Sequence, residues 1–280
     1  MNKAMQDYSR SRFRDLGVTR LPGELYRRDP ILTITGWIHL VLLVLGLILF
    51  WFDSREILGI NPWIKPMKFA LSIWIYLWTM AFLFGYLSVP KKWLRVLGGL
   101  ISLMLFIEIV CIYMQSFRGT ISHFNAETAF DGYIYSMMGA MIALNTVFVV
   151  IVLILFFTNT KGLPRIVAWG IRLGIIGFVL GSAVGGKMVL EVAHTVGAAD
   201  GGPGLPFLNW STIAGDLRIA HFLGLHTLQL FPLAAYGLNR RNTLSVGSKW
   251  FVFTLFVVLY SALLVGIYTQ ALHGLPLISS

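Results

Sequence analysis

Long apolar stretches alternate with short polar segments along the whole chain after residue 30. A helix needs about 20 apolar residues to cross roughly 30 Å of hydrocarbon, and only a helix satisfies its own backbone polar groups in lipid. Seven stretches meet this length, approximately residues 31–52, 67–89, 93–117, 132–157, 166–190, 218–238 and 249–272. The pattern predicts an all-α integral membrane protein, a bundle of about seven transmembrane helices.

The composition agrees with a chain whose solvent is lipid. Of the 280 residues, 57% are hydrophobic and only 12% are charged, which does not describe a water-soluble surface. The formal net charge of +10 would favour nucleic acid as the partner of a soluble protein. Here the basic residues gather in the predicted loops of one membrane face, so we exclude nucleic acid and expect the lipid bilayer as the partner.

The positions of lysine and arginine predict the orientation in the membrane. With the N-terminus inside, sixteen of the twenty-two basic residues fall on the cytoplasmic side, as the positive-inside rule requires. Seven spans then leave the C-terminus on the extracytoplasmic side. We expect the protein in the plasma (inner) membrane.

Two segments outside the predicted spans have features of their own. Residues 1–30 form a basic cytoplasmic tail, either an amphipathic helix on anionic lipid or a disordered topology signal. Residues 31–280 form the seven-helix transmembrane domain, which includes a long outer loop, residues 191–217. The loop is rich in glycine and proline, which oppose regular structure. We expect it to fold as an ordered lid or a re-entrant loop rather than a plain connector, with Ser211 or Asp216 capping the next helix.

A stripe of glycines recurs every three or four residues in the stretch 166–190, at Gly170, Gly174, Gly177, Gly181 and Gly185. Small residues at this spacing let the backbone of another helix approach closely. We therefore expect tight helix packing along the stripe, and a homo-oligomer that forms through it is a further expectation.

Carboxylates and histidines collect near the predicted outer face. Glu191 and His194 are three residues apart, which places both on one face of a continued helix, where they can chelate one metal. His221 reaches the same level if the long loop brings the neighbouring helices together. These three residues form the predicted metal site, suited to Zn, Fe or Mn. The leading hypothesis is a membrane-embedded metal-dependent enzyme that acts on a lipidic or small amphiphilic substrate.

Three further residues are candidate catalytic groups. Glu108 lies within the stretch 93–117, where an ionisable side chain is costly unless it faces the interior of the bundle or a wet cavity. Arg118 can hold a carboxylate or phosphate through two parallel hydrogen bonds, and His123 can exchange a proton near neutral pH. A structural role is the alternative for each group, because histidines hydrogen-bond between helices and carboxylates pair with nearby lysines and arginines.

Two other functions remain open. His39 and His226 lie at similar depth at a rise of about 1.5 Å per residue, so they could bind haem b from two helices or serve quinone redox chemistry. Alternatively, the charged residues near the outer face bind an ion or solute, as in a transporter or receptor.

Overall fold

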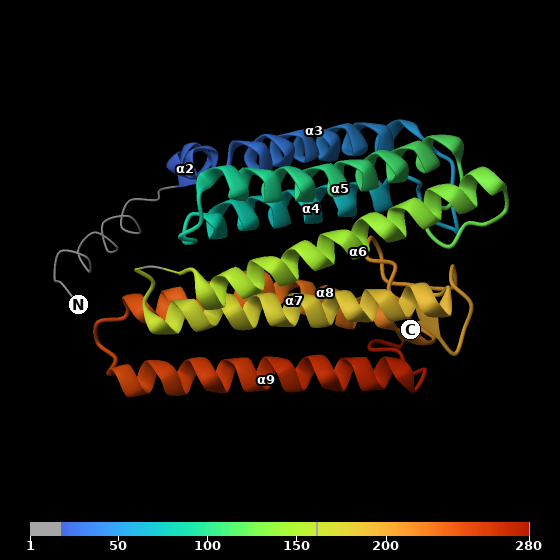
Figure 1. Cartoon of the computed structure of the whole chain (residues 1–280). Helices are drawn as coiled ribbons and strands as arrows, with labels where there is room; N and C mark the ends of the chain where they lie inside the picture. The colour runs from blue at the N-terminus through green and yellow to red at the C-terminus, as the bar shows by residue number, and fades with distance from the viewer. Residues whose placement is uncertain (1–17, 161, 280) are drawn as a thin grey trace. The chain divides into compact units, whose positions relative to one another are not determined.

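The structure, a computed structural model, describes residues 18–160 and 162–279. Within these residues the chain is almost entirely helical (Figure 1). A short 3-10 turn at Val18–Arg20 leads into eight α-helices: α2 (Leu21–Arg28), α3 (Pro30–Phe52), α4 (Ile64–Phe84), α5 (Lys91–Arg118), α6 (Ala129–Thr158), α7 (Arg165–Glu191), α8 (Leu217–Arg240) and α9 (Val246–Leu272). Between α7 and α8, two short strands, β1 (Thr195–Val196) and β2 (Gly215–Asp216), pair in antiparallel orientation.

Six of the described helices are long and apolar enough to cross a membrane, namely α3, α4, α5, α6, α7 and α9. The chain is therefore a multi-pass helical membrane protein. The predicted stretch 218–238 also forms one helix, α8, of 24 residues, but polar side chains such as His221 and His226 lower its hydropathy. A seventh span, the orientation of the termini and the identity of the membrane stay predictions.

Reporter fusions in a bacterial host test the number of spans. If α8 crosses the membrane with the other six helices, the two ends of the chain lie on opposite sides. We expect alkaline phosphatase fused after the last residue to be active and green fluorescent protein at that position to be dark, whereas green fluorescent protein ahead of Met1 fluoresces. Two ends on the same side would remove α8 from the spans.

The described residues form two compact units. Unit 1 comprises the chain as far as Ser54, Pro62–Arg118 and Ala140–Arg165. Unit 2 comprises Arg55–Asn61, Gly119–Gly139 and the chain from Ile166 onward.

Unit 1 is built on α3, α4 and α5, which pack against one another (Figure 1). Its core contains fully buried apolar residues from each of these helices, such as Leu32, Leu77 and Ile101. The part of α6 in this unit is joined to α4 by a hydrogen bond of 3.2 Å from the hydroxyl of Tyr76 to the amide oxygen of Asn145. The core of unit 1 is therefore mostly apolar, with one polar contact between α4 and α6.

The N-terminal tail contains an ordered helix in its described part. Residues 1–17 lie outside the described residues. Residues 21–28 form α2, which packs on α3 and α4 in unit 1. Leu25 is buried, and the side chain of Arg28 is only 6% exposed. This part of the tail is therefore fixed to the helices by its own side chains.

The second predicted span, residues 67–89, corresponds to α4, which instead begins at Ile64 and ends at Phe84. A proline at the third helical position, Pro66, is tolerated in the first turn of a helix. At the other end, Arg28 of α2 donates a hydrogen bond to the carbonyl of Phe82. The last carbonyls of a helix have no partner inside it, so Arg28 acts as a cap from another helix.

The glycine stripe of α7 packs against α8 within unit 2. A Cβ atom built on Gly181 would lie 2.7 Å from the carbonyl carbon of Gly224, and one on Gly174 would lie 2.7 Å from the carbonyl oxygen of Thr227. The predicted close approach of another helix backbone is confirmed, and α8 of the same chain supplies that backbone. A homo-oligomer through this stripe stays a prediction.

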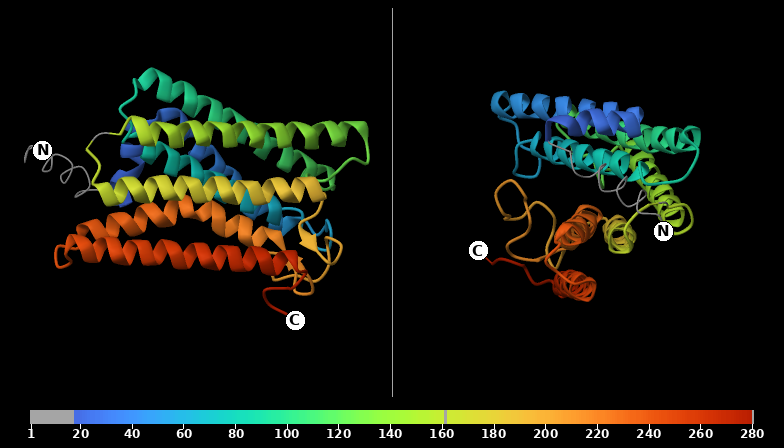
Figure 2. Two further views of the ribbon diagram at one scale, coloured as in Figure 1. Left: turned by 60° about the horizontal axis from the view of Figure 1, so that its bottom comes forward. Right: turned by 90° about the vertical axis from the view of Figure 1, so that its left-hand side faces the viewer.

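The long loop 191–217 is ordered around its two strands at one end of α7, α8 and α9 (Figure 2). Thr195 pairs with Asp216, and Val196 pairs with Gly215. Asp216 accepts a hydrogen bond from the backbone N–H of Arg218, so it is the N-cap of α8, as the sequence predicted. The strands also contact α9.

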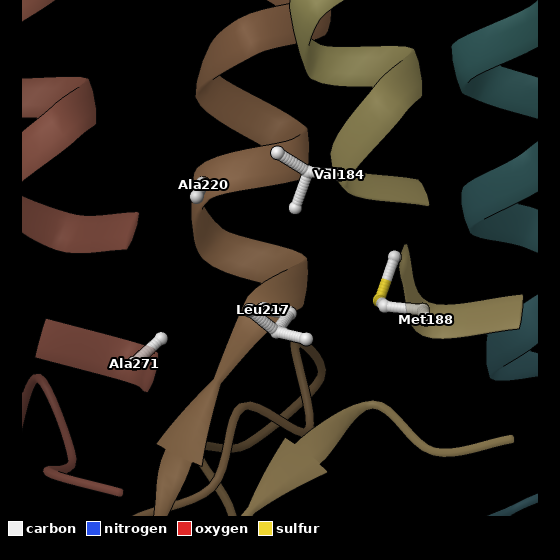
Figure 3. Close-up of a cluster of buried hydrophobic side chains, with 5 residues drawn as sticks. All are labelled: Val184, Met188, Leu217, Ala220 and Ala271. Atoms are coloured by element: carbon white, nitrogen blue, oxygen red, sulfur yellow. The ribbon is translucent and has the colours of Figure 1, made fainter. Parts of the chain in front are cut away.

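A small apolar cluster seals the junction of these helices. It contains Val184 and Met188 of α7, Leu217 and Ala220 of α8, and Ala271 of α9 (Figure 3). Elsewhere α9 has one other buried residue, Phe253. Its many exposed apolar side chains are typical of a helix that faces lipid.

Candidate functional site

Glu108 is a buried carboxylate within a predicted span of unit 1. The residue is 1% exposed, and both carboxylate oxygens are shielded from solvent. It lies ten residues before Arg118, the last residue of α5, which corresponds to about 15 Å along the helix. The ammonium group of Lys65, in the first turn of α4, interacts electrostatically with the carboxylate. An acidic and a basic group of unit 1 thus attract each other.

The end of α5 beyond Glu108 is occupied by an aromatic group. The ring of Trp63 lies 5.9 Å from that of Tyr113 and 4.7 Å from that of Phe117. The indole N–H of Trp63 donates a hydrogen bond of 2.8 Å to Asp53. We call Trp63, Tyr113 and Phe117 the aromatic cap. Two of its members, Tyr113 and Phe117, lie on α5 between Glu108 and the end of the helix.

Arg118 stands at that same end of α5. Its guanidinium donates a hydrogen bond to the side-chain oxygen of Gln115, which is itself fully buried. Arg118 and Glu108 are therefore in the same unit and on the same helix, about 15 Å apart along it. The predicted anion-binding role of Arg118 stays a prediction.

His39 is fully buried in α3. Its Nδ1 lies 2.7 Å from the carbonyl oxygen of Thr35, and the Leu105 carbonyl of α5 also lies beside the ring. Its Nε2 is buried and has no hydrogen-bond partner among the described residues. A carbonyl can only accept a hydrogen bond, so Nδ1 carries the proton and Nε2 is the basic nitrogen of the neutral ring.

His226, the second histidine of the haem hypothesis, belongs to unit 2. It is half-buried in α8, with its ring centroid 4.3 Å from that of Phe222. His39 and His226 are thus described in separate units. Haem binding by this pair stays a prediction, which an absorption spectrum of the purified protein would test.

Two polar groups that the sequence did not single out lie in unit 1 on the far side of His39 from Glu108. Asp29 is fully buried before the first residue of α3, and its Oδ1 accepts a hydrogen bond of 2.9 Å from the backbone N–H of Leu32. Its Oδ2 and the hydroxyl of Ser102 in α5 are buried without a partner among the described residues. The Asp-Pro pair at 29–30 was a usable signal, because aspartate favours the N-cap and proline the first helical position.

The electrostatics of Asp29 follow from its position. Burial raises the pKa of its carboxyl above the usual range, against the opposing effects of two backbone N–H groups and of the positive charge of Arg95. Desolvation disfavours the charged form of a carboxyl group. Asp29 is therefore more easily protonated than an exposed aspartate.

The predicted metal ligands all lie in unit 2 but have separate partners. Glu191 is exposed and pairs with Lys187 at 2.8 Å, the structural alternative for this residue. The Nδ1 of His194 lies 2.6 Å from Asp200, and that of His221 lies 2.8 Å from the carbonyl oxygen of Gly181. Ligating histidines are commonly oriented by such bonds. Among the residues described, however, no three His, Cys, Asp or Glu side chains are close enough to hold a metal.

Asp200 is the main polar centre of the long loop 191–217, although the sequence pattern did not single it out. Its carboxylate accepts hydrogen bonds from the backbone N–H groups of His194 and Thr195 and from the hydroxyl of Thr195. Burial raises the pKa of this carboxyl, but hydrogen bonds and the charge of His194 outweigh it and hold the pKa well below its usual range. The only sequence signal was an isolated acidic residue in a glycine-rich loop.

Contacts between aromatic rings connect His123 with the same loop. The ring of Phe124 is 4.8 Å from His194 and 5.7 Å from Tyr135, and His123 is 6.5 Å from Tyr135. The Nδ1 of His123 lies 3.1 Å from the hydroxyl of Ser122. The structure therefore brings His123 and His194 around a shared aromatic side chain, whereas Glu108 and Arg118 belong to unit 1.

The comparisons with known proteins give no assignment. No family model matches the chain. No curated protein and no solved structure is significantly similar to it. The chemistry of the two units is therefore the basis for assigning a function.

Proposed function

We propose that this protein is a transporter that moves a small cation across the membrane, with Glu108 as the cation-binding group. The observation that supports it is the burial of Glu108 inside a 28-residue apolar helix. A charged group at this position costs about 2.5–3.5 kcal/mol on insertion scales, and such residues commonly line ion pathways.

Lys65 supports the exchange of one cation for another at the Glu108 carboxylate. Its positive charge stabilises ionised Glu108 when no other cation is bound. An incoming cation would take over this role, and the ammonium group would turn toward water. A structural ion pair alone explains the burial poorly, because desolvation offsets most of the attraction between buried charges.

The aromatic cap supports controlled access to Glu108. Trp63 is 1% exposed and is held by Asp53, so its movement would require the loss of a hydrogen bond. Tyr113, whose hydroxyl donates to the carbonyl of Leu42 in α3, ties the cap to a second helix. With the N-terminus in the cytoplasm, this end of unit 1 faces the extracytoplasmic side.

Purified protein in phospholipid vesicles tests the proposal. The vesicles contain indicators for H⁺, Na⁺ or K⁺ in separate preparations, and a potential or concentration gradient drives uptake. We expect flux of one cation above that of empty vesicles, with an initial rate at least tenfold lower in Glu108→Gln, because the amide has no charge to exchange.

Glu127→Gln is the matched control, since Glu127 is an exposed carboxylate outside the helices. It should transport like the wild type. Equal flux in Glu108→Gln and wild-type vesicles, or no flux of any of the three cations, would contradict the proposal.

The metal-dependent enzyme remains a second candidate because His194 and His221 are oriented as ligating histidines often are. Stoichiometric metal in the purified protein, lost in His194→Ala, would favour it over transport.

A further inference from the structure

We infer that the transported cation is a proton and that it passes between Glu108 and Asp29 by way of His39 and Ser102. This inference rests on the transport function proposed above and names its substrate. The route lies wholly within unit 1, along the contact of α3 with α5.

The route follows one side of α5. Gly98, Ser102, Leu105 and Glu108 are separated by four, three and three residues, so they succeed one another along neighbouring positions of the helix surface. Together they cover about 15 Å of its length. Each position carries or faces a polar group, and all four residues are buried.

Asp29 forms the inner end of this row. A Cβ atom on Gly98 would lie 2.8 Å from Oδ2 of Asp29, so the absence of a side chain there lets the carboxylate reach α5. Ser102 follows one turn later. Both Oδ2 of Asp29 and the hydroxyl of Ser102 are buried without a partner among the described residues. In native proteins, buried polar atoms of this kind are commonly bonded to internal water.

His39 stands between Ser102 and Glu108 in this order, because its ring lies beside the carbonyl of Leu105. The basic Nε2 can accept a proton while Nδ1 remains bonded to Thr35. Carbonyl groups beside the ring stabilise its protonated form by accepting its N–H groups. A histidine in this setting can receive a proton and release it again.

The wide spacing of the polar groups along the route favours a proton over a metal cation as the transported ion. Hard metal cations need several oxygen ligands at once, and the described residues contain no cluster of three acidic, histidine or cysteine side chains. Single polar groups about 5 Å apart along a helix can be bridged by one water each, and carboxylate and histidine chains are the usual proton relays of membrane proteins.

The proton transfers along this route need no reactant other than water. Glu108 takes a proton from water on the side of the aromatic cap, and Lys65 compensates its charge after release. The proton then bonds to Nε2 of His39, leaves it through water beside Ser102, and reaches Oδ2 of Asp29. Release from Asp29 next to Arg95 restores the ionised carboxylate.

Proton entry into vesicles with an internal pH indicator, driven by a K⁺ diffusion potential with valinomycin, tests the route. We expect the initial rate to fall at least tenfold in Asp29→Asn and in His39→Gln. Asparagine caps helices as well as aspartate does, so Asp29→Asn keeps the start of α3. Thermal unfolding of each variant checks that it is folded.

His273→Gln is the matched control for His39→Gln. His273 also bonds through Nδ1 to the carbonyl four residues earlier, Thr269, but is exposed at the end of α9. Its proton flux should equal that of the wild type.

The outcomes separate this inference from the proposed function. Flux of Na⁺ or K⁺ without H⁺ would overturn the inference and leave cation transport standing. Proton flux that requires Glu108 but is unchanged in Asp29→Asn and His39→Gln would overturn the route alone. No flux of any cation would overturn both.

Discussion

Gly181→Ala is expected to lower the thermal midpoint of the detergent-purified protein by roughly 5 °C. A Cβ atom at this position would lie 2.7 and 2.8 Å from backbone atoms of Gly224 in α8. Backbone atoms cannot turn aside as a flexible side chain can, so α7 and α8 must separate. Overpacking of this kind costs about 1–3 kcal/mol, and about 2–4 °C accompanies each kcal/mol in proteins of this size.

Gly186→Ala in the same helix is the matched control. A Cβ atom on Gly186 meets no atom within 4 Å. Alanine is favoured over glycine inside a helix by about 1 kcal/mol, so this variant should be as stable as the wild type or slightly more stable. Tryptophan fluorescence during heating gives both midpoints. If Gly181→Ala unfolds at the wild-type temperature, the close packing of α7 on α8 is wrong.

Arg28→Ala is expected to destabilise unit 1 by about 2–3 kcal/mol, the range of a hydrogen-bonded charged group that is lost from a buried site. The guanidinium bonds to Glu24 at 2.9 Å and to the carbonyl of Phe82, and it lies 4.4 Å from the ring centre of Phe82 and 4.7 Å from that of Tyr86. Its removal leaves the end of α4 without its cap and frees α2 from the helices.

The single cysteine of the chain reports this change. Cys111 is buried in α5 of unit 1, so a thiol-reactive dye labels it only when this unit opens. Labelling on heating should begin at a lower temperature in Arg28→Ala. Arg27→Ala is the control, because the Arg27 side chain is 77% exposed and touches Glu24 only at the surface. Exposed pairs contribute about 0–1 kcal/mol. Equal labelling of the two variants would contradict the capping role of Arg28.

The positions of the long helices could be predicted from the sequence because lipid imposes a length. Each predicted stretch corresponds to one helix, and most ends agree within about three residues. The larger difference is at the end of α4. Gly85, the C-cap of α4, is a local stop signal after Phe84, and Arg28 of α2 caps the same end from 54 residues away.

The candidate sites were predictable only in part. The burial of Glu108 follows from its place in an apolar stretch, since an ionisable group avoids lipid. The hydrogen-bond partner of His194 could not be predicted from the sequence in the same way. The sequence paired it with Glu191, three residues earlier, but α7 ends at Glu191 and Val192 adopts a left-handed backbone with φ of 53°. The change of direction turns His194 toward Asp200 instead.

A multi-pass helical membrane protein follows from the sequence alone, because the hydrocarbon layer requires long apolar helices and their lengths can be counted along the chain. The sequence also marked Glu108 as an unusual residue. Which polar groups lie near one another depends on the packing of the helices. Asp29 and Ser102 are more than 70 residues apart in sequence, and they lie along the same stretch of α5 because α3 packs against it. Contacts between helices depend on side chains that meet across the bundle, and spacing within one helix does not encode them.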